Sequence, residues 1–311
     1  MKKFRNTILF VLPLFSILLW SFNLQMPVDD VTYQKEIKEW QAKRDADLKS
    51  ASSPLNLIGI YFLKEGVNTF GSAETNDLVL PKGKIAEHAG QYVLKNDTIT
   101  LQLKEASGVE YKGITVLTKS DLPSPDDTKL VSKDTTIQIQ HGSLKWFLFI
   151  SGGRIAARVL DAQSENQLAF KGVERFPVNK KWRVEAKFQP YEEGKKIEIT
   201  TVKGKTNLRA AAGLVVFTLE GKEYKLEALD RGPNLFFVFS DQTSVNDKTY
   251  AFRFLSAKKP GADHVVIVDF NKATNPNCAF SSHAPCPLPP AQNKLTIAIQ
   301  AGEKKYTAAQ N

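Results

Sequence analysis

From Leu55 onward the sequence is a succession of short β-branched and aromatic runs, and this rhythm limits the possible folds more than any other feature. The runs recur at a spacing of about 8–12 residues, with Gly, Asn, Asp and Pro between them. No segment of helical periodicity interrupts them, which disfavours a parallel sheet built from strand–helix–strand units. The sequence therefore predicts an all-β fold with antiparallel strands.

The runs fall into two groups that differ in length and hydrophobicity. Those between residues 54 and 140 are short, as in an antiparallel β-sandwich. Those between residues 141 and 311 are longer and more apolar. A long series of hairpins predicts a closed or nearly closed barrel, because such a meander must protect its edges. We therefore expect a β-sandwich over 54–140, followed by an antiparallel β-barrel-like domain over 141–311.

The segment before the strands begins with a targeting pattern. Lys2, Lys3 and Arg5 precede an apolar run from Ile8 to Phe22, which is the arrangement of a signal peptide or membrane anchor over residues 1–26. The run is shorter than the roughly 20 residues that cross a bilayer comfortably, so a cleaved signal is slightly favoured over a retained anchor. Basic residues stay on the cytoplasmic side. We expect a periplasmic protein, or one anchored to the outer face of the cytoplasmic membrane, with membrane contact only through this segment.

Residues 27–53 contain a helical pattern that runs from Val31 to Lys49. Asp29, Asp30 and Thr32 are candidate N-caps. Apolar residues recur near one face of this helix, with charged residues around the rest: they are Tyr33, Ile37, Trp40 and Leu48. We expect an amphipathic helix that lies across the β-sandwich, and a helix that binds a partner is the alternative.

The net charge of +9 identifies no partner by itself. The basic residues are scattered singly, without the clusters or interleaved aromatic residues of a nucleic-acid groove. We therefore expect no nucleic-acid partner. The four histidines are dispersed, and the sequence lacks phosphate-loop, dinucleotide, zinc-protease and serine-hydrolase motifs. No metal and no cofactor is expected.

The stretch from Asp269 to Lys304 is rich in proline, and its middle is not expected to pair in a sheet. The apolar run Val265–Val268 before it and the alternating run Leu295–Ile299 near its end are expected to be strands. A loop of this length inside a compact domain is unusual and tends to be functional. The sequence therefore directs the search for a site to this stretch.

The same stretch holds both cysteines of the chain, Cys278 and Cys286. In an oxidising compartment two cysteines at this spacing most simply form a disulfide. Free buried thiols are one alternative. A metal site with His283 is another, although a closed zinc site requires four ligands and only three candidates are present locally.

Three motifs of the stretch resemble the closing signature of a known family. They are DFNxAxNPxCAF from Asp269, CPLPPxxNxL from Cys286, and AGEK, which ends at Lys304. Together they resemble domain-of-unknown-function family 1684, a bacterial and archaeal family, and the resemblance runs from about Trp40 to Lys304. It implies a shared fold. It implies no mechanism, because the family has no established site.

A second resemblance lies in the first group of strands. The segments Gly66–Ser72 and Asn76–Leu80, followed by His88, resemble the core of a forkhead-associated domain, a β-sandwich whose loops bind phosphothreonine. Ser72 stands where that family has an arginine, and Ile85 stands where it has a serine. Without the guanidinium, phosphate loses its bidentate partner. We therefore expect the sandwich, a loop-bracing role for His88, and no phosphothreonine peptide as a partner.

Several charged residues lie inside or at the ends of apolar runs, where a charge is costly unless it is paired or faces a cavity. One interpretation is a structural network of arginines and carboxylates that fastens the long loop to the barrel. The other is a polar pocket at the barrel mouth, roofed by that loop. The candidate ligand-binding residues are Arg158, Asp241, Tyr250, Arg253, Asp269, Asn271 and Glu303.

Two functions of different classes follow from these residues. The first is an exported binding or scaffold protein for a small polar ligand, a glycan or an envelope partner. The second is an envelope hydrolase or lyase in which Asp269 and Glu303 are the acid–base pair. In that case Arg158 or Arg253 would hold an anionic substrate. The absence of a recognised nucleophile motif favours binding.

Overall fold

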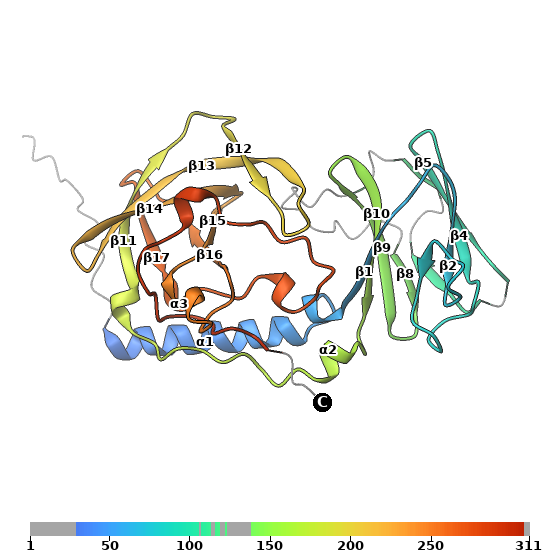
Figure 1. The fold of residues 1–311 in the computed structure, drawn as a ribbon, viewed down its shortest axis with the longest axis horizontal. Helices are drawn as coiled ribbons and strands as arrows, with labels where there is room; N and C mark the ends of the chain where they lie inside the picture. Colours follow the sequence, from blue (N-terminus) through green and yellow to red (C-terminus); the bar gives the residue numbers. More distant parts are fainter. Residues whose placement is uncertain (1–28, 106, 113–115, 119–121, 123–137, 308–311) are drawn as a thin grey trace, which may run out of the picture.

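The computed structural model describes residues 29–105, 107–112, 116–118, 122 and 138–307. Strands predominate in this part of the chain, which confirms the predicted all-β class (Figure 1). The predicted signal peptide or anchor, residues 1–26, lies outside the described residues. Within the described ranges, no helix is long and apolar enough to cross a membrane.

The N-terminal half consists of a long helix and two five-stranded sheets. Its elements are α1 (Asp30–Lys49), η1 (Pro54–Asn56), β1 (Leu57–Phe62), β2 (Gly66–Gly71), β3 (Leu78–Val79), β4 (Gly90–Lys95), β5 (Thr98–Leu103), β6 (Glu110–Lys112), β7 (Val116–Thr118), β8 (Gln138–His141), β9 (Leu144–Ser151) and β10 (Arg154–Asp161). The strand orders are β1-β10-β9-β8-β6 and β3-β2-β4-β5-β7. The two sheets, called the sheet pair below, enclose a core in which Phe70 packs against Tyr92 and Trp146.

The sheet pair ends at Asp161 rather than near residue 140, where the sequence placed the domain boundary. β9 and β10 form a hairpin, and β10 pairs with β1 from Leu57↔Leu160 to Phe62↔Ala156. Trp146 and Val159 from this hairpin are buried in the core of the sheet pair. β9 and β10 are strongly apolar because one face of this hairpin packs in this core, while Phe147 and Leu160 on the other face pack with barrel residues.

The second half forms a nearly closed antiparallel barrel, as predicted. Its elements are α2 (Glu165–Leu168), η3 (Lys180–Trp182), β11 (Arg183–Pro190), β12 (Lys196–Thr200), β13 (Thr206–Leu219), β14 (Lys222–Arg231), β15 (Asn234–Phe239), α3 (Gln242–Val245), β16 (Arg253–Lys258), β17 (Val265–Asp269), η4 (Phe270–Lys272), η5 (Asn277–Ala279) and η6 (Ala291–Asn293). The strand order is β16-β15-β14-β13-β11-β17, with β12 beside β13. The strand order leaves a gap between its two end strands, β16 and β17. Phe254 of β16 exchanges two backbone hydrogen bonds of 2.9 Å with Thr274, just after η4, and these bonds narrow the gap.

The interior of the barrel is a packed apolar core. Phe217, Phe237, Phe239 and Phe270 fill it together with smaller side chains from most of the strands. Phe239 and Phe270 meet edge to face with ring centroids 5.5 Å apart, a favourable geometry for aromatic pairs. The barrel is therefore held by its filled apolar centre.

The run Leu295–Ile299 enters this core without forming the predicted strand. Its alternation is real, since Leu295, Ile297 and Ile299 are buried. However, it is bonded only at isolated points: Leu295 N donates to Ser240 O at 2.8 Å, and Gln242 N donates to Ile297 O at 2.9 Å. The partner at its far end is the side chain of Arg253, which donates to backbone carbonyls in place of a neighbouring strand.

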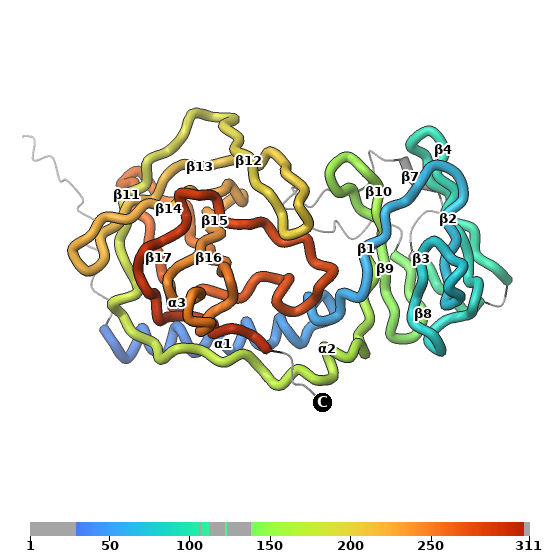
Figure 2. The backbone as a smooth tube through the Cα atoms, in the orientation of Figure 1, coloured from blue at the N-terminus to red at the C-terminus, as the bar shows by residue number. Residues whose placement is uncertain are grey.

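Helix α1 begins and ends close to the predicted limits. The side chain of Asp29 caps it by accepting hydrogen bonds of 2.9 Å from the backbone N–H groups of Val31 and Thr32. Its buried residues, Tyr33, Ile37 and Leu48, lie on the predicted apolar face. The helix packs along the barrel domain instead of the sheet pair, and Figure 2 shows it beside the closing segment of the chain. The apolar face alone could not show which domain it covers.

Candidate functional site

Asp269 closes β17 and is bonded to helix α1. Its Oδ1 accepts a hydrogen bond of 2.8 Å from the hydroxyl of Tyr33, and one of 3.1 Å from the backbone N–H of Asn271. The amide of Asn271 donates to the same Tyr33 oxygen at 2.9 Å and to the carbonyl of Asn179, also at 2.9 Å. Only 6% of Asp269 is exposed. The DFN motif is therefore a binding point for the first turns of α1.

Glu303 of the AGEK motif is fully buried, with 0% exposure, and is bonded on both oxygens. Oε1 accepts a hydrogen bond of 2.9 Å from Nε of Arg44 in α1. Oε2 accepts hydrogen bonds from the backbone and side-chain N–H groups of Asn275 at 2.7 and 3.1 Å. A second cation, Arg175, lies 3.8 Å from Oε1 and also pairs with Asp45 of α1 at 2.5 Å. The motif therefore holds the second half of the helix.

The glycine of AGEK is required by the same contact. Gly302 has φ of +74°, a conformation that side chains disfavour. A Cβ on this residue would lie 2.5 Å from the carbonyl oxygen of Ala273 and 2.8 Å from that of Phe270. Only glycine lets the chain approach the DFN motif closely enough to place Glu303.

Arg253 forms a third buried group at the same end of the barrel. Only 1% of Arg253 is exposed. Its guanidinium donates a hydrogen bond of 2.6 Å to Oδ2 of Asp241. It also donates to the carbonyls of Ala301 and Ile299, the latter at 3.0 Å. Asp241 in turn caps α3 through the backbone N–H of Thr243. Burial lowers the pKa of Arg253, while the charges of Asp241 and Glu303 oppose this shift.

We call these three groups the clasp. It consists of Asp269, Asn271 and Tyr33; of Glu303, Asn275 and Arg44; and of Arg253 and Asp241. Five of the seven predicted ligand-binding residues belong to it. They are engaged with one another, with α1 or with the closing segment. The arrangement agrees with a structural network of arginines and carboxylates.

The other two predicted residues lie elsewhere. Arg158 is in β10 of the sheet pair, between Ile60 and Phe147 in the register. Tyr250 precedes β16 and lies against Cys278, and burial and this thiol raise the pKa of Tyr250 to about 12. The candidate residues are therefore divided among three places: the clasp, β10 of the sheet pair, and the segment before β16.

The predicted disulfide is absent, and Cys278 and Cys286 are free thiols. They are neighbours: the backbone N–H of Cys278 lies 2.9 Å from Sγ of Cys286. The hydrogen bond from Cys286 lowers the pKa of Cys278. The loop is fastened without a bridge, because Val202 N donates to Cys286 O at 2.9 Å and Leu288 N donates to Thr200 O at 2.8 Å. Among the described residues, no group of three or more His, Cys, Asp or Glu side chains could hold a metal ion.

The clasp contains partners that the sequence did not single out as site residues. Tyr33, Arg44 and Asn275 complete it, and the first two lie more than 200 positions from their carboxylates. The burial of Tyr33 could be predicted from the sequence, since it lies on the apolar face of α1. No sequence feature distinguishes Arg44, because it is one of many charged residues in the helical pattern. Its guanidinium also lies 5.7 Å from the ring centroid of Phe280 in the CAF motif.

The sheet pair contains the residues that resemble a phosphothreonine site. Ser72 is buried, and its hydroxyl donates to the carbonyl of Ile85 at 3.0 Å. Nδ1 of His88 lies 3.2 Å from Oδ1 of Asn76, whose amide bonds the carbonyls of Ala73 and Glu87. His88 thus braces a loop. The expected absence of phosphothreonine-peptide binding stays a prediction.

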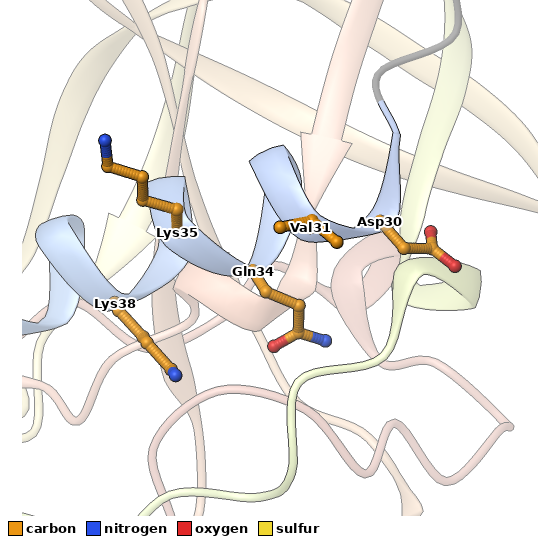
Figure 3. Close-up of a pocket in the computed structure, with 5 residues that line it drawn as sticks. All are labelled: Asp30, Val31, Gln34, Lys35 and Lys38. Atoms are coloured by element: carbon orange, nitrogen blue, oxygen red, sulfur yellow. The ribbon is translucent and has the colours of Figure 1, made fainter.

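A hollow of about 420 Å³ lies beside the first turns of α1 (Figure 3). The described residues that line it are Asp30, Val31, Gln34, Lys35 and Lys38. In Figure 3 the side chains of Lys35 and Lys38 extend in different directions. Their charged groups do not converge, so we do not assign a site there.

Fold and clasp together define a class: an all-β protein in which a barrel holds an N-terminal helix through a polar closing signature. Residues 168–304 match the model of the family described as a protein of unknown function, DUF1684. This confirms the resemblance of the closing motifs, over a shorter region than the one from Trp40 that the sequence suggested. The matched region contains the barrel strands and ends at the clasp.

Comparison with solved structures gives an uncharacterised protein of Haloarcula marismortui, determined in solution by NMR. Its sequence identity to this chain is 27% and the TM-score is 0.38. The similarity covers 46% of this chain and 80% of that chain. No curated protein matches the chain significantly.

The Asp269 carboxyl should give stability an unusual pH dependence. Burial raises the pKa of Asp269 above its ordinary value of 3.8, although the Tyr33 hydrogen bond and Lys272 oppose the shift. The native state therefore binds this proton more tightly than the unfolded chain does. Its contribution to stability is fully present below 3.8 and is lost as the pH rises through the folded pKa. In Asp269→Asn, which stays neutral, this loss should be absent.

The measurement is the free energy of unfolding of both proteins across the acidic range. The difference, variant minus wild type, should rise with pH from about 3.8 and level off above the folded pKa. Asp230→Asn is the matched control, since Asp230 is an exposed carboxylate that pairs with Lys259. A difference that stays flat for Asp269→Asn would show that Asp269 is not desolvated by its contact with α1.

Proposed function

We propose that this chain is an exported cell-envelope protein that binds or scaffolds a small polar ligand, a glycan or an envelope partner. The observation that carries the proposal is the state of the candidate catalytic carboxylates. Asp269 and Glu303 are buried and bonded within the clasp. Their role is therefore structural, and a ligand or partner would bind to the exposed surfaces of the two domains.

The same observation weighs against the hydrolase or lyase alternative. A general acid or base must come within hydrogen-bond reach of the proton it transfers. Both oxygens of Glu303 already accept hydrogen bonds, and Oδ1 of Asp269 accepts three. A substrate would have to displace α1 to reach them. Binding is the function that the arrangement supports better.

Export is supported by the basic start of the sequence and by the apolar run from Ile8 to Phe22. α1 starts at Asp30, shortly after this run. If the run stays in the membrane, the clasp fixes the barrel to the anchored helix. If it is cleaved, the clasp retains the new N-terminal segment on the folded body. Either way the role of the clasp is to join the start of the mature protein to its barrel.

Fractionation of cells that express the full chain tests the exported location. We expect the protein in the periplasmic or membrane fraction, accessible to protease added outside the inner membrane. The control is a chain without residues 1–26, which should stay in the cytoplasm. Recovery of the full-length chain as a soluble cytoplasmic protein would contradict the proposal.

A further inference from the structure

The two cysteines of the chain form a pair of nucleophilic side chains that the clasp does not use, called the thiol pair below. Sγ of Cys286 accepts a hydrogen bond of 2.9 Å from the backbone N–H of Cys278, and the two thiols are hydrogen-bonded to each other. Cys286 is 4% exposed and lies in an apolar cluster that includes Leu57 and Phe252. Cys278 packs against this cluster but is partly exposed. A reagent in solution therefore meets Cys278 first.

The surroundings of the pair favour a thiolate on Cys278. Its sulfur is hydrogen-bonded by the thiol of Cys286 and by the hydroxyl of Tyr250, and the positive charge of Lys203 acts on it as well. Together these groups lower the pKa of Cys278, although burial opposes the shift. The hydrogen bond between the thiols, together with burial, raises the pKa of Cys286. Cys286 and Tyr250 therefore keep their protons and act as donors, while Cys278 is the sulfur that carries the charge.

The long loop does not depend on a bond between the two sulfurs. On the side of Cys286 its main chain is tied to the turn between β12 and β13, through Val202 N to Cys286 O at 2.9 Å. Two residues later Leu288 N donates to Thr200 O at 2.8 Å. Because these main-chain hydrogen bonds fasten the loop while both thiols are reduced, the redox state of the pair is free to change without loss of the contacts that hold the loop.

We propose that the thiol pair carries out thiol–disulfide exchange with a small organic disulfide, in which Cys278 is the attacking thiolate and Cys286 is the resolving thiol. The thiolate is the form of cysteine that attacks a disulfide. Reactive cysteines are accessible, have a lowered pKa and stand next to a second thiol, as Cys278 does. A small partner is favoured because Cys278 is only partly exposed. This activity goes beyond the proposed binding function and uses different residues from the clasp.

The exchange takes place in two steps. Sγ of Cys278 bonds to one sulfur of the external disulfide, whose S–S bond breaks, and the other half leaves as a thiolate that takes up the proton of Cys286. The mixed disulfide no longer carries the charge that raises the pKa of Cys286. Cys286 then attacks Sγ of Cys278 and expels the second half as a thiolate, which is protonated by water. The pair loses two electrons, and the external disulfide is reduced to two thiols.

The test uses the full chain, reduced and then freed of reductant in the absence of oxygen, with dithiodipyridine as the disulfide probe. Wild type should release both halves of the probe and retain no pyridyl adduct. Cys286→Ser should release one half and keep the other on Cys278, as mass spectrometry would show. Cys278→Ser should react about tenfold more slowly or less, because Cys286 is shielded and protonated. Wild-type speed in Cys278→Ser, or a lasting adduct in wild type, would overturn the proposal.

A variant that keeps both cysteines tests the thiolate itself. Tyr250→Phe removes one hydrogen-bond donor to Cys278, so the pKa of this thiol should rise. The rate at which iodoacetamide alkylates Cys278 would be followed against pH, and its midpoint should move up by about one pH unit. Tyr191→Phe is the matched control, since the hydroxyl of Tyr191 is bonded to Glu227; its midpoint should equal that of wild type. An unchanged midpoint in Tyr250→Phe would contradict the role of Tyr250 and the stabilised thiolate.

The same measurements separate this inference from the proposed function. An exported protein whose thiols react no faster than those of an ordinary buried cysteine would retain the proposed location and overturn only the exchange activity. A protein recovered from the cytoplasm that consumes the probe through Cys278 and Cys286 in the order described would support the exchange activity and overturn the proposed location.

Discussion

Replacement of Arg253 with methionine should lower the free energy of unfolding by about 3–5 kcal/mol, the usual cost of breaking a buried ion pair from one side. Methionine fills much of the same volume, so the loss is chiefly electrostatic. It leaves Asp241 charged and buried, and it removes the donors to the carbonyls of Ile299 and Ala301. Thermal melting should show a decrease of roughly 10 °C for a domain of this size.

The double variant Arg253→Met/Asp241→Asn is the matched control. Asparagine keeps an oxygen that can cap α3 at Thr243, and it removes the unpaired negative charge. The double variant should therefore melt above the single Arg253→Met variant. A single variant that melts within a degree of the wild type would refute the view that the closing segment is held by this pair.

Glu303→Gln should have an effect of similar size, about 3–5 kcal/mol. The carboxylate accepts hydrogen bonds on both oxygens, from Arg44 on one and from Asn275 on the other. Glutamine has one acceptor and one donor group, so its NH₂ must face one of these donors. The substitution also leaves the Arg44 guanidinium without its buried partner. Chemical denaturation monitored by tryptophan fluorescence would measure the loss.

Glu174→Gln provides the comparison for this variant. Glu174 is exposed and pairs with Lys304, next to Glu303, at 3.3 Å. A surface pair of this kind contributes about 0–1 kcal/mol, so its loss should be hardly measurable. Equal effects of the two substitutions would mean that Glu303 is no more important than a surface charge.

Local patterns predicted most of the elements. Asp29 as the cap and the apolar spacing of Tyr33, Ile37 and Leu48 gave the limits of α1 within one residue. The alternation around Arg253 correctly placed Phe252 and Phe254 on the opposite face from the guanidinium. These predictions succeeded because burial acts on residues a few positions apart, where periodicity is visible.

Contacts between distant segments were harder to predict. Nothing in the sequence links Arg44 to Glu303 or shows that α1 covers the barrel, because any amphipathic helix can cover either domain. The domain boundary at Asp161 depends on the pairing of β10 with β1, which the hydrophobicity of a run does not reveal. Leu295–Ile299 has the alternation of a strand, but a side chain replaces the neighbouring strand.

The candidate site was predicted in part. The sequence identified Asp241, Arg253, Asp269, Asn271 and Glu303 by the cost of charge in apolar runs, and the clasp contains them all. The sequence could not show that Arg158 lies outside the clasp. A charge inside an apolar run is costly at a domain junction as well, so the same criterion selected it. It also predicted a disulfide where main-chain hydrogen bonds fasten the loop.

The central claim is that the closing signature, through the clasp, holds helix α1 on the barrel. Amide hydrogen exchange tests this claim most directly. Exchange would be followed in wild type and in Glu303→Gln under native conditions, where local opening is resolved from global unfolding. The account predicts that amides of α1, residues 30–49, lose protection while those of β13 to β15 keep it. Unchanged protection of α1 in a variant that still folds would contradict the account.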